Sequence, residues 1–325
     1  MAVALITGGA GFIGSHLAQA LLNQGDDVVI VDNFDTYYSP EIKKQNLNVV
    51  RQTGDITFIS GDAGDFTAMQ SLLQKHQVDV VFHEAARPGV RASLAEPLAT
   101  HQKNVMTALH LLRAATEAEV DCFVNASSSS VYGEPVTLPL EETHCCRPLS
   151  PYGASKLSVE AYVHSFYEVY DLPSVSLRYF TVYGPRMRPD LAIFHFTQQL
   201  LDGERPIVFG DGTQKRDFTY IDDIIQANLR VLKQQPWGET INVGSGQHIS
   251  INELLEQLAT LTGQDANPVH QDRICGDVSH TWANVDKARQ LLDWQPTVTL
   301  EDGLHRFVDW YRQHQDLYHR CLANP

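Results

Sequence analysis

A glycine-spaced segment near the N-terminus constrains the fold more than any other feature of the sequence. An apolar run at residues 3–7 leads directly into Gly8, Gly11 and Gly14, and a stretch with helical apolar spacing follows. Glycine there allows a tight turn, a close approach of a ligand to the backbone, and packing of the helix against the strand. Unpaired N–H groups at the start of a helix also attract phosphate. The segment therefore predicts a strand–turn–helix unit that binds the pyrophosphate of a dinucleotide.

Short apolar runs alternate with helix-period segments throughout the first 180 residues. The runs are nearly continuous in apolar residues, as is usual for parallel strands that are covered on both faces. Their order predicts an α/β fold, a Rossmann-type doubly wound parallel sheet with right-handed crossovers. The predicted strands are residues 3–7, 28–32, 56–60, 78–83, 122–127 and 175–180.

The pattern changes after residue 180, where shorter strand-like runs alternate with helices. A capping box, Ser250-x-x-Glu253, opens one of these helices, and Gly263 ends it. We expect a dinucleotide-binding domain at residues 1–180 and a smaller mixed α/β substrate lobe at residues 181–325. Some segments of the second half are expected to return to the first domain.

Composition narrows the kinds of partner and compartment. The chain has 24 Lys and Arg against 39 Asp and Glu, a formal net charge of −15, and such a surface repels nucleic acid. Its five cysteines form no C-x-x-C pair, which argues against a zinc site and favours the cytoplasm. The histidines show no ligand spacing, so we expect no metal. We expect no membrane span, because no apolar run is long enough, and no signal peptide, because the N-terminus lacks basic residues and has glycines where an apolar region should continue.

A carboxylate at the end of the second predicted strand indicates the type of dinucleotide. Asp32 lies 18 residues after Gly14, where it can accept hydrogen bonds from both ribose hydroxyls of adenosine. It would also repel a 2′-phosphate, and the first basic residue after it is Lys43. We therefore expect NAD rather than NADP. Asp62, after the third strand, can face the adenine or can be a turn residue.

A Tyr-x-x-x-Lys pair and a serine run indicate chemistry on an alcohol. Tyr152 and Lys156 share one face of a predicted helix, where the ammonium group favours the phenolate form of the tyrosine. A phenolate can act as a general base toward a substrate hydroxyl. The fifth predicted strand ends in four serines, residues 127–130, at the edge where open α/β sheets bind ligands. One of them can bind the same substrate oxygen, or the run can simply satisfy backbone groups.

The sequence resembles the extended short-chain dehydrogenase/reductase family, specifically its members that modify nucleotide sugars, over essentially the whole chain. The resemblance implies Tyr152 as the base, Lys156 as its partner and a ligand of the nicotinamide ribose, and Ser128 as the anchor of the substrate hydroxyl. The motifs that carry it are T-G-G-A-G-F-I-G at 7–14, S-S-S-S-V-Y-G at 127–133, S-P-Y-G-A-S-K at 150–156, R-Y-F-T-V-Y-G-P-R at 178–186, R-D-F-T-Y-I-D-D at 216–223 and G-D-V at 276–278.

The resemblance also implies binding residues at both ends of the site, and a homodimer. Among the residues implied for the UDP-sugar, Arg216 would supply a positive charge for the diphosphate. Alternatively, Arg216 and Asp277 could form a surface ion pair that binds no ligand. The residues implied for NAD are Gly8, Gly11, Phe12, Ile13, Gly14, Asp32, Asn33, Asp62, Ala63, Ala85, Ala86, Asn104, Tyr152, Lys156 and Tyr179. Those implied for the UDP-sugar are Arg91, Ser127, Ser128, Ser129, Thr181, Arg186, Arg216 and Asp277.

The residues around the serine run narrow the reaction. Dehydratases of this family carry an Asp-Glu pair directly after the catalytic hydroxyl residue, whereas this chain carries only serines. The resemblance then implies epimerisation at C4, in which NAD reversibly oxidises the sugar to a 4-keto form that rotates and is reduced again. Thr181 and the segments 89–91 and 184–190 look like UDP-glucuronate 4-epimerases, although Arg87 and Pro88 stand where that subfamily has Gln and Ala.

Two alternatives remain open. The same chemistry could act on UDP-glucose and UDP-galactose, or on their N-acetyl forms, and rates on acidic and neutral sugars would distinguish these. The chain could also be a catalytically silent nucleotide-sugar or NAD-binding regulator, although Ser128, Tyr152 and Lys156 are all present. A substrate carboxylate could be bound by neutral hydroxyls or by the charge of Arg87, Arg91 or Arg186.

Overall fold

A seven-stranded sheet forms the centre of the computed structural model, which describes residues 1–323. The strand order is β11-β6-β5-β4-β1-β2-β3, and every neighbouring pair is parallel. This confirms the predicted α/β fold. The strands are β1 (Val3–Thr7), β2 (Asp27–Asp32), β3 (Ile56–Ser60), β4 (Val80–His83), β5 (Cys122–Ser128), β6 (Ser174–Tyr179) and β11 (Thr240–Val243).

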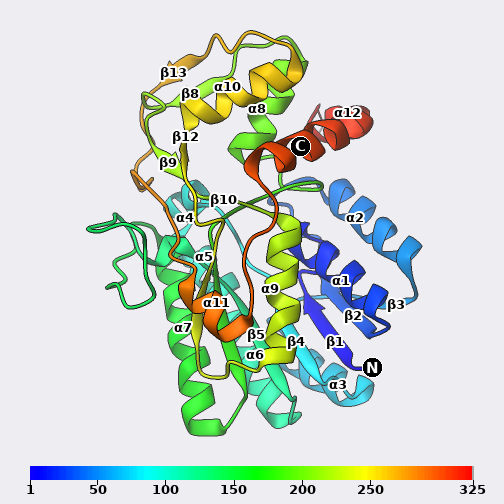
Figure 1. The fold of residues 1–325 in the computed structure, drawn as a ribbon. Helices are drawn as coiled ribbons and strands as arrows, with labels where there is room; N and C mark the ends of the chain where they lie inside the picture. The colour runs from blue at the N-terminus through cyan, green and yellow to red at the C-terminus, as the bar shows by residue number, and fades with distance from the viewer. Residues whose placement is uncertain (324–325) are drawn as a thin grey trace.

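Helices cover both faces of the sheet and form two apolar cores (Figure 1). Alternate strand residues face opposite cores: Ala4 and Ile6 belong to one, and Leu5 to the other. Because side chains alternate across a strand, a continuous apolar run fills both cores at once. One face packs against α1 (Phe12–Gln24), α2 (Pro40–Thr53) and α9 (Ile221–Gln234), the other against α3 (Phe66–His76), α6 (Thr107–Glu117) and α7 (Pro151–Tyr170).

A smaller lobe lies beyond the carboxyl ends of the sheet strands, at the top of Figure 1. Its short strands pair two by two, β8 with β13 in parallel and β9 with β12 antiparallel. The predicted capping box of Ser250 and Glu253 is present, and Gly263 ends that helix at a φ of +72°. The lobe contains α8 (Ala192–Leu201), β8 (Ile207–Phe209), β9 (Lys215–Arg216), β12 (Ile249–Ser250), α10 (Ile251–Thr262), β13 (Val269–Gln271) and α12 (Leu300–Ala323).

Parts of the second half return to the sheet. β11 pairs with β6 at the sheet edge, α9 packs against α1, and α11 (Asp286–Leu292) packs against α9 and β11. The division of the chain at residue 180 stays a prediction, since the two halves interleave in this way. The remaining elements are α4 (Val90–Ala95), α5 (Pro97–His101), a π-helical turn η1 (Gln102–Met106), a 3-10 turn η2 (Ser129–Val131), β7 (Thr181–Tyr183) and β10 (Phe218–Tyr220).

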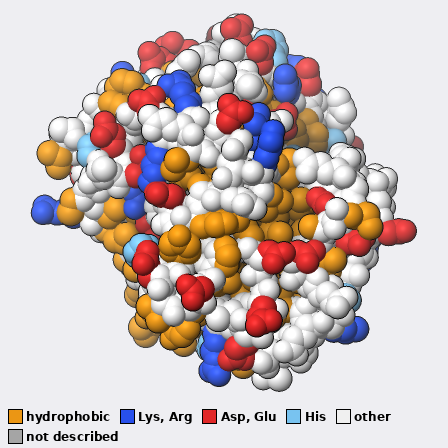
Figure 2. All heavy atoms as spheres, turned by 60° about the horizontal axis from the view of Figure 1, so that its bottom comes forward, with side chains coloured by type: hydrophobic (Ala, Val, Ile, Leu, Met, Phe, Trp, Pro, Cys, Tyr) orange, Lys and Arg blue, Asp and Glu red, His pale blue; other side chains and the backbone are white. Residues whose placement is uncertain are grey.

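The surface in Figure 2 carries acidic side chains scattered among hydrophobic and neutral ones, with basic side chains in small groups. Within residues 1–323, no helix combines the length and the hydropathy that crossing a bilayer requires. The same residues contain no group of His, Cys, Asp and Glu arranged to hold a metal ion. All five cysteines are free thiols.

Candidate active site

The glycine turn after β1 has the backbone that its sequence predicts. Gly8 has a φ of +71°, and a Cβ on it would lie 2.9 Å from the Cα of Ala85. A Cβ on Gly14 would lie 2.5 Å from the carbonyl oxygen of Gly8, so that only glycine allows α1 to start this close to the turn. No side chain caps the start of α1. Its first N–H groups therefore stay available to an anion.

A cavity of about 210 Å³ opens at this turn and runs to the start of α7. Its wall combines residues at or just after the carboxyl ends of β1, β2, β3, β4, β5 and β6. Most residues predicted to bind a dinucleotide lie on this wall: Gly8, Gly11, Phe12, Ile13, Gly14, Asp32, Asn33, Asp62, Ala63, Ala85, Ala86, Tyr152, Lys156 and Tyr179.

Asp32 lies on the cavity wall with its carboxylate fixed by the backbone. Its Oδ2 accepts a hydrogen bond from the Ala10 N–H at 3.1 Å, and its Oδ1 accepts one from the Phe34 N–H at 2.8 Å. Burial raises the pKa of Asp32, and these N–H groups and Lys43 oppose the rise. The Lys43 ammonium itself donates to the Asp35 carbonyl oxygen at 2.6 Å.

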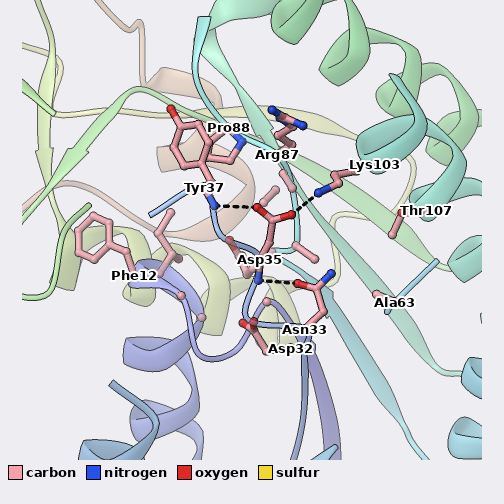
Figure 3. A pocket seen from close by; sticks show the side chains of 18 of the residues that line it. Phe12, Asp32, Asn33, Asp35, Tyr37, Ala63, Arg87, Pro88, Lys103 and Thr107 are labelled. Carbon is pink, nitrogen blue, oxygen red and sulfur yellow. Dashed lines mark hydrogen bonds and ion pairs between the residues drawn. The ribbon is translucent and has the colours of Figure 1, made fainter. Parts of the chain in front are cut away.

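A second carboxylate at this end was not predicted. Asp35 accepts hydrogen bonds from the Tyr37 N–H and from the Lys103 ammonium, so that the loop after β2 is joined to η1 (Figure 3). Asn33 accepts from the Asp35 N–H at 2.9 Å in the same loop. The loop after β2 is therefore held in place beside the cavity.

The start of α7 packs directly onto the serine run. Ser150 caps this helix by accepting from the Gly153 N–H at 3.1 Å. A Cβ on Gly153 would lie 2.4 Å from the Ser130 carbonyl oxygen, so the glycine next to Tyr152 permits this contact. The Lys156 ammonium donates to the Ala126 carbonyl oxygen at 2.6 Å. Tyr152, Lys156 and the end of β5 are thus brought to one end of the cavity.

The serines of this run differ in what their hydroxyls contact. Ser127 was predicted to contact substrate, but its hydroxyl donates to the buried Glu160 carboxylate. Ser128 points elsewhere, because neighbouring strand residues face opposite sides, and its hydroxyl contacts that of Ser130 at 3.2 Å. Ser127 is part of the cavity wall, whereas Ser128 and Ser129 lie outside it, and the contact of each with a substrate stays a prediction.

A buried ion pair lies behind Ser127. Arg178 donates from Nε and Nη2 to the two Glu160 oxygens at 2.9 and 2.8 Å, and both side chains are 6% exposed. Arg178 Nη1 also donates to the Tyr132 hydroxyl at 2.9 Å, which in turn donates to Asn242 Oδ1 at 2.7 Å. This network joins α7, β6, β11 and the loop that follows the serines.

The two arginines of the segment after β7 face opposite directions. Arg186, predicted to bind substrate, is buried, donates to Gln19 Oε1 of α1 at 2.6 Å and lies outside the cavity wall. Its φ is +65°, which turns the chain and brings Arg188 onto the wall instead. Burial opposes the charge of Arg188, but Asp190, Tyr37 and Tyr152 outweigh it, so that the pKa of Arg188 is raised.

Asn104, Arg91 and Thr181, also predicted as ligands, lie outside the cavity wall as well. Asn104 is buried; its side-chain oxygen accepts from the Arg87 N–H, and its amide nitrogen donates to the Arg87 carbonyl oxygen. The same nitrogen also donates to the Ser155 hydroxyl at 2.9 Å. Asn104 therefore holds the wall residue Arg87 in position and does not itself line the cavity. Arg91 is exposed and stacks its guanidinium 4.1 Å from the centre of the Phe209 ring. Thr181 is half-buried in β7.

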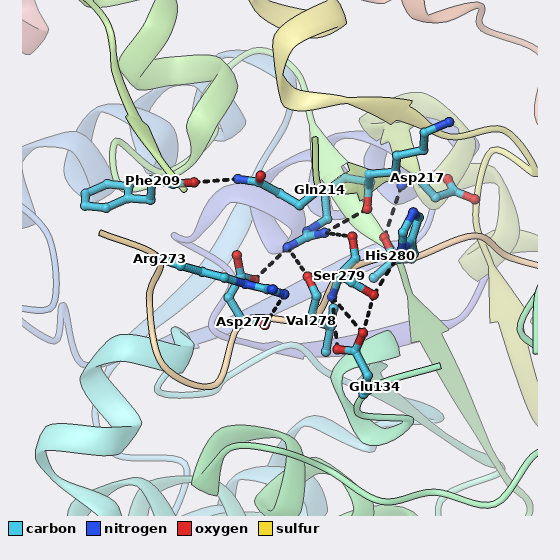
Figure 4. Close-up of polar contacts among 12 residues, drawn as sticks. Glu134, Phe209, Gln214, Asp217, Arg273, Asp277, Val278, Ser279 and His280 are labelled. Atoms are coloured by element: carbon cyan, nitrogen blue, oxygen red, sulfur yellow. Dashed lines mark hydrogen bonds and ion pairs between the residues drawn. The ribbon is translucent and has the colours of Figure 1, made fainter. Parts of the chain in front are cut away.

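Arg216 and Asp277 form an ion pair in the smaller lobe, and Figure 4 shows Asp277 among the polar residues around it. Arg216 Nη2 donates to Asp277 Oδ1 at 2.7 Å and to the Val278 carbonyl oxygen at 2.8 Å. The two residues thus form the ion pair that the sequence offered as an alternative to nucleotide binding, and their contact with a nucleotide stays a prediction. Glu134, just after the serine run, accepts from the Ser279 hydroxyl and N–H and joins this cluster to the sheet.

Besides Asp35, sequence reasoning missed four charged residues of the wall: Lys43, Glu84, Lys103 and Arg188. Glu84 directly follows β4, and a carboxylate at the end of an otherwise apolar strand was a signal in the sequence. Arg188 lies within a run that was recognised, but the left-handed turn at Arg186 that selects between the two arginines has no signal in the residue types.

Known proteins resemble this chain over nearly its whole length. The sequence profile of a family described as GDP-mannose 4,6 dehydratase matches residues 5–307. A UDP-glucuronate 4-epimerase of Thermodesulfobacterium geofontis is 40% identical, over 96% of this chain and 97% of its own. The crystal structure of UDP-glucuronic acid 4-epimerase from Bacillus cereus with UDP-glucuronic acid and NAD is 41% identical, covers 96% and 99% of the two chains and gives a TM-score of 0.91. A UDP-glucose 4-epimerase from Thermotoga maritima, solved with UDP-glucose, is 36% identical over 96% and 99%, with the same TM-score of 0.91.

Proposed function

The chain belongs to the GDP-mannose 4,6 dehydratase family of extended short-chain dehydrogenases/reductases, and we propose that it interconverts UDP-glucuronate and UDP-galacturonate by NAD-dependent epimerisation at C4. One observation carries this proposal. A single cavity joins the uncapped start of α1 and Asp32 to Tyr152 and Lys156. The function requires the dinucleotide and the base that deprotonates the substrate hydroxyl to lie in the same cavity.

The residues of the cavity fit NAD. The glycine turn has no room for side chains and offers free N–H groups to the pyrophosphate, and Asp32 keeps oxygen lone pairs for the adenosine ribose. Lys156, at the other end, would donate to the nicotinamide ribose. When bound, NAD supplies a nicotinamide ring that takes a hydride from C4 of the sugar and gives it back.

The side chains of the protein would transfer the proton of the substrate hydroxyl and hold that hydroxyl in position. Tyr152 takes the proton of the C4 hydroxyl as the base and returns it after the sugar has rotated. Ser128 would hold that hydroxyl, while Lys156, fixed on the Ala126 carbonyl oxygen, provides a positive charge on the same wall. The strand end carries serines where a dehydratase needs an acid–base pair, so the keto sugar has no partner here for loss of water.

Arg188 is the charged group that we propose for the acidic sugar. It is half-buried on the cavity wall, which Tyr152 also lines. Its Nε and Nη2 are held by Asp190, at 2.9 and 3.1 Å, which fixes the orientation of the guanidinium. A fixed cation near the reacting carbon suits a substrate carboxylate and would also keep it from the orientation that favours loss of carbon dioxide.

We expect the purified protein to convert UDP-glucuronate into UDP-galacturonate without added reductant, and kcat/KM to be at least about tenfold higher for UDP-glucuronate than for UDP-glucose. Arg188→Gln should reduce that preference, whereas Arg113→Gln, at an exposed arginine of α6 that is paired with Glu117, should keep it. Chromatography of the products checks both. Faster turnover of the neutral sugar would favour a UDP-glucose epimerase, and a UDP-pentose as main product would contradict the assignment.

We further propose that the protein works in the cytoplasm as a homodimer. The five free thiols are compatible with a reducing compartment. Large apolar side chains are exposed on the adjoining helices α4, α5 and α7, including Leu94 at 41%, Leu98 at 85% and Tyr162 at 40%. Covering such side chains with a second copy would remove apolar area from water. Light scattering should give the mass of two chains, and the mass of one would rule the dimer out.

A further inference from the structure

One carboxyl group on the cavity wall has no part in the proposed mechanism. Glu84 follows β4 and lies on the same wall as Tyr152, Lys156 and Tyr179. Its Oε1 accepts a hydrogen bond from the Tyr179 hydroxyl at 3.0 Å. Burial raises the pKa of Glu84 to about 7, although Tyr179 and Lys156 favour the charged form. The charge of this residue therefore changes close to neutral pH.

The hydrogen bonds around Tyr179 fix this carboxyl group in place. Asn228, fully buried in α9, donates from its amide nitrogen to the Tyr179 oxygen at 2.8 Å and to the Ile224 carbonyl oxygen at 2.9 Å. With its oxygen satisfied in this way, the Tyr179 hydroxyl can donate its proton to Glu84. Within residues 1–323 the other carboxylate oxygen, Oε2, has no hydrogen-bond partner, and it is not completely buried. Oε2 can therefore act on what occupies the cavity.

The position of Glu84 determines which part of NAD it acts on. A sugar held by Tyr152 can exchange a hydride only with a nicotinamide ring next to it, and Glu84 lies on the same wall, close enough to Lys156 to interact with its charge. The oxidised ring is a cation and the reduced ring is neutral. A carboxylate in a poorly solvated cavity stabilises the cation and has little effect on the neutral ring.

We infer that Glu84 is an electrostatic partner of the oxidised nicotinamide, which makes bound NAD harder to reduce and so favours the return of the hydride to the keto sugar. The inference rests on the proposed function, because it requires NAD in this cavity. The carboxylate would thus promote the return of the hydride, which every turnover of an epimerase requires. Two electrons and one hydrogen leave C4 as hydride and must come back, and a keto sugar that escapes first leaves the enzyme reduced and inactive.

The inference has a definite pH dependence. Lys156 from α7 and Tyr179 from β6 face Glu84, and on its own strand burial lowers the pKa of His83 to about 3, so that His83 is neutral above pH 5. Glu84 is protonated below its pKa of about 7 and charged above it. The preference of the protein for NAD over NADH should therefore increase as the pH rises from about 6 to about 8.

The test measures the dissociation constants of NAD and NADH for the purified full chain at pH 6 and pH 8, without sugar. Glu84→Gln keeps a hydrogen-bond acceptor for Tyr179 and removes the charge, and it should reduce the preference for NAD at pH 8 by about tenfold and abolish its pH dependence. Glu84→Asp keeps the charge and should retain most of the preference. Tyr179→Phe removes a hydrogen bond that favours the charged form, so the preference should persist but should appear at a higher pH than in the unchanged protein.

A second readout follows the cofactor in the presence of UDP-glucuronate. Glu84→Gln should accumulate more absorbance at 340 nm than the unchanged protein does, because less of the hydride returns. Tight binding of both nucleotides with equal preference in the unchanged protein and Glu84→Gln would overturn this inference alone. A loss of preference in Tyr179→Phe but not in Glu84→Gln would also overturn it, in favour of a structural role. Failure of every variant and of the unchanged protein to bind either nucleotide would overturn the proposed function as well.

Discussion

Tyr152→Phe is expected to lower the rate of epimerisation by about 10³-fold, while the binding of NAD and UDP-glucuronate stays close to that of the unchanged protein. The substitution removes one oxygen atom, the base that takes the proton of the C4 hydroxyl. The ring itself and the packing of α7 on the serine run, which depends on Gly153, are preserved. The loss should therefore appear in kcat, measured by separation of the two UDP-uronates, with KM changed little.

Tyr162→Phe is the matched control for this substitution. Tyr162 lies on the same helix, is 40% exposed and is not part of the cavity wall, so the same loss of a hydroxyl should leave the rate unchanged. If Tyr152→Phe kept a rate within about tenfold of the unchanged protein, the base would have to be another group. Glu84, which lies on the same wall, would then be the next candidate.

Much of the fold could be predicted because parallel strands buried on both faces leave a local signal. All six strands expected in the first half are present, and their bounds differ from the expected ones by at most two residues. The place of β11 was harder to predict. Its sequence, Thr-Ile-Asn-Val, reads as a strand, but its partner β6 lies some sixty residues earlier in the chain. Local pattern cannot indicate which sheet such a strand joins.

The candidate site shows the same limit at the scale of single side chains. The glycine turn, Asp32 and Tyr152 were found because each belongs to a continuous segment with its own pattern. Ser127 and Arg186 were predicted to bind substrate, and in the structure Ser127 donates to Glu160 and Arg186 to Gln19, so that their contact with a substrate stays a prediction. Their direction depends on strand alternation and on one left-handed residue, and neither follows from residue type.

Removing Glu160 is expected to lower the free energy of unfolding by about 3–5 kcal/mol, which makes Glu160→Ala the most destabilising of the changes considered. The substitution leaves the Arg178 guanidinium buried without its carboxylate, although Tyr132 still accepts from it, and it also releases the Ser127 hydroxyl. An unpaired charge in a dry interior costs far more than the pair contributes, because the guanidinium loses water without gaining a carboxylate. The decrease should be visible as an earlier midpoint in urea unfolding.

A double variant separates the cost of an unpaired charge from a general loss of packing. Glu160→Leu with Arg178→Met replaces both charges by apolar groups of similar size, and it should recover most of the stability that Glu160→Ala loses. Glu117→Gln serves as the exposed control, because the Arg113–Glu117 pair on α6 is 65% and 36% exposed and should be worth less than about 1 kcal/mol. If the double variant were as unstable as the single one, the pair would not act through its charges, and the defect would have to come from packing between α7 and β6.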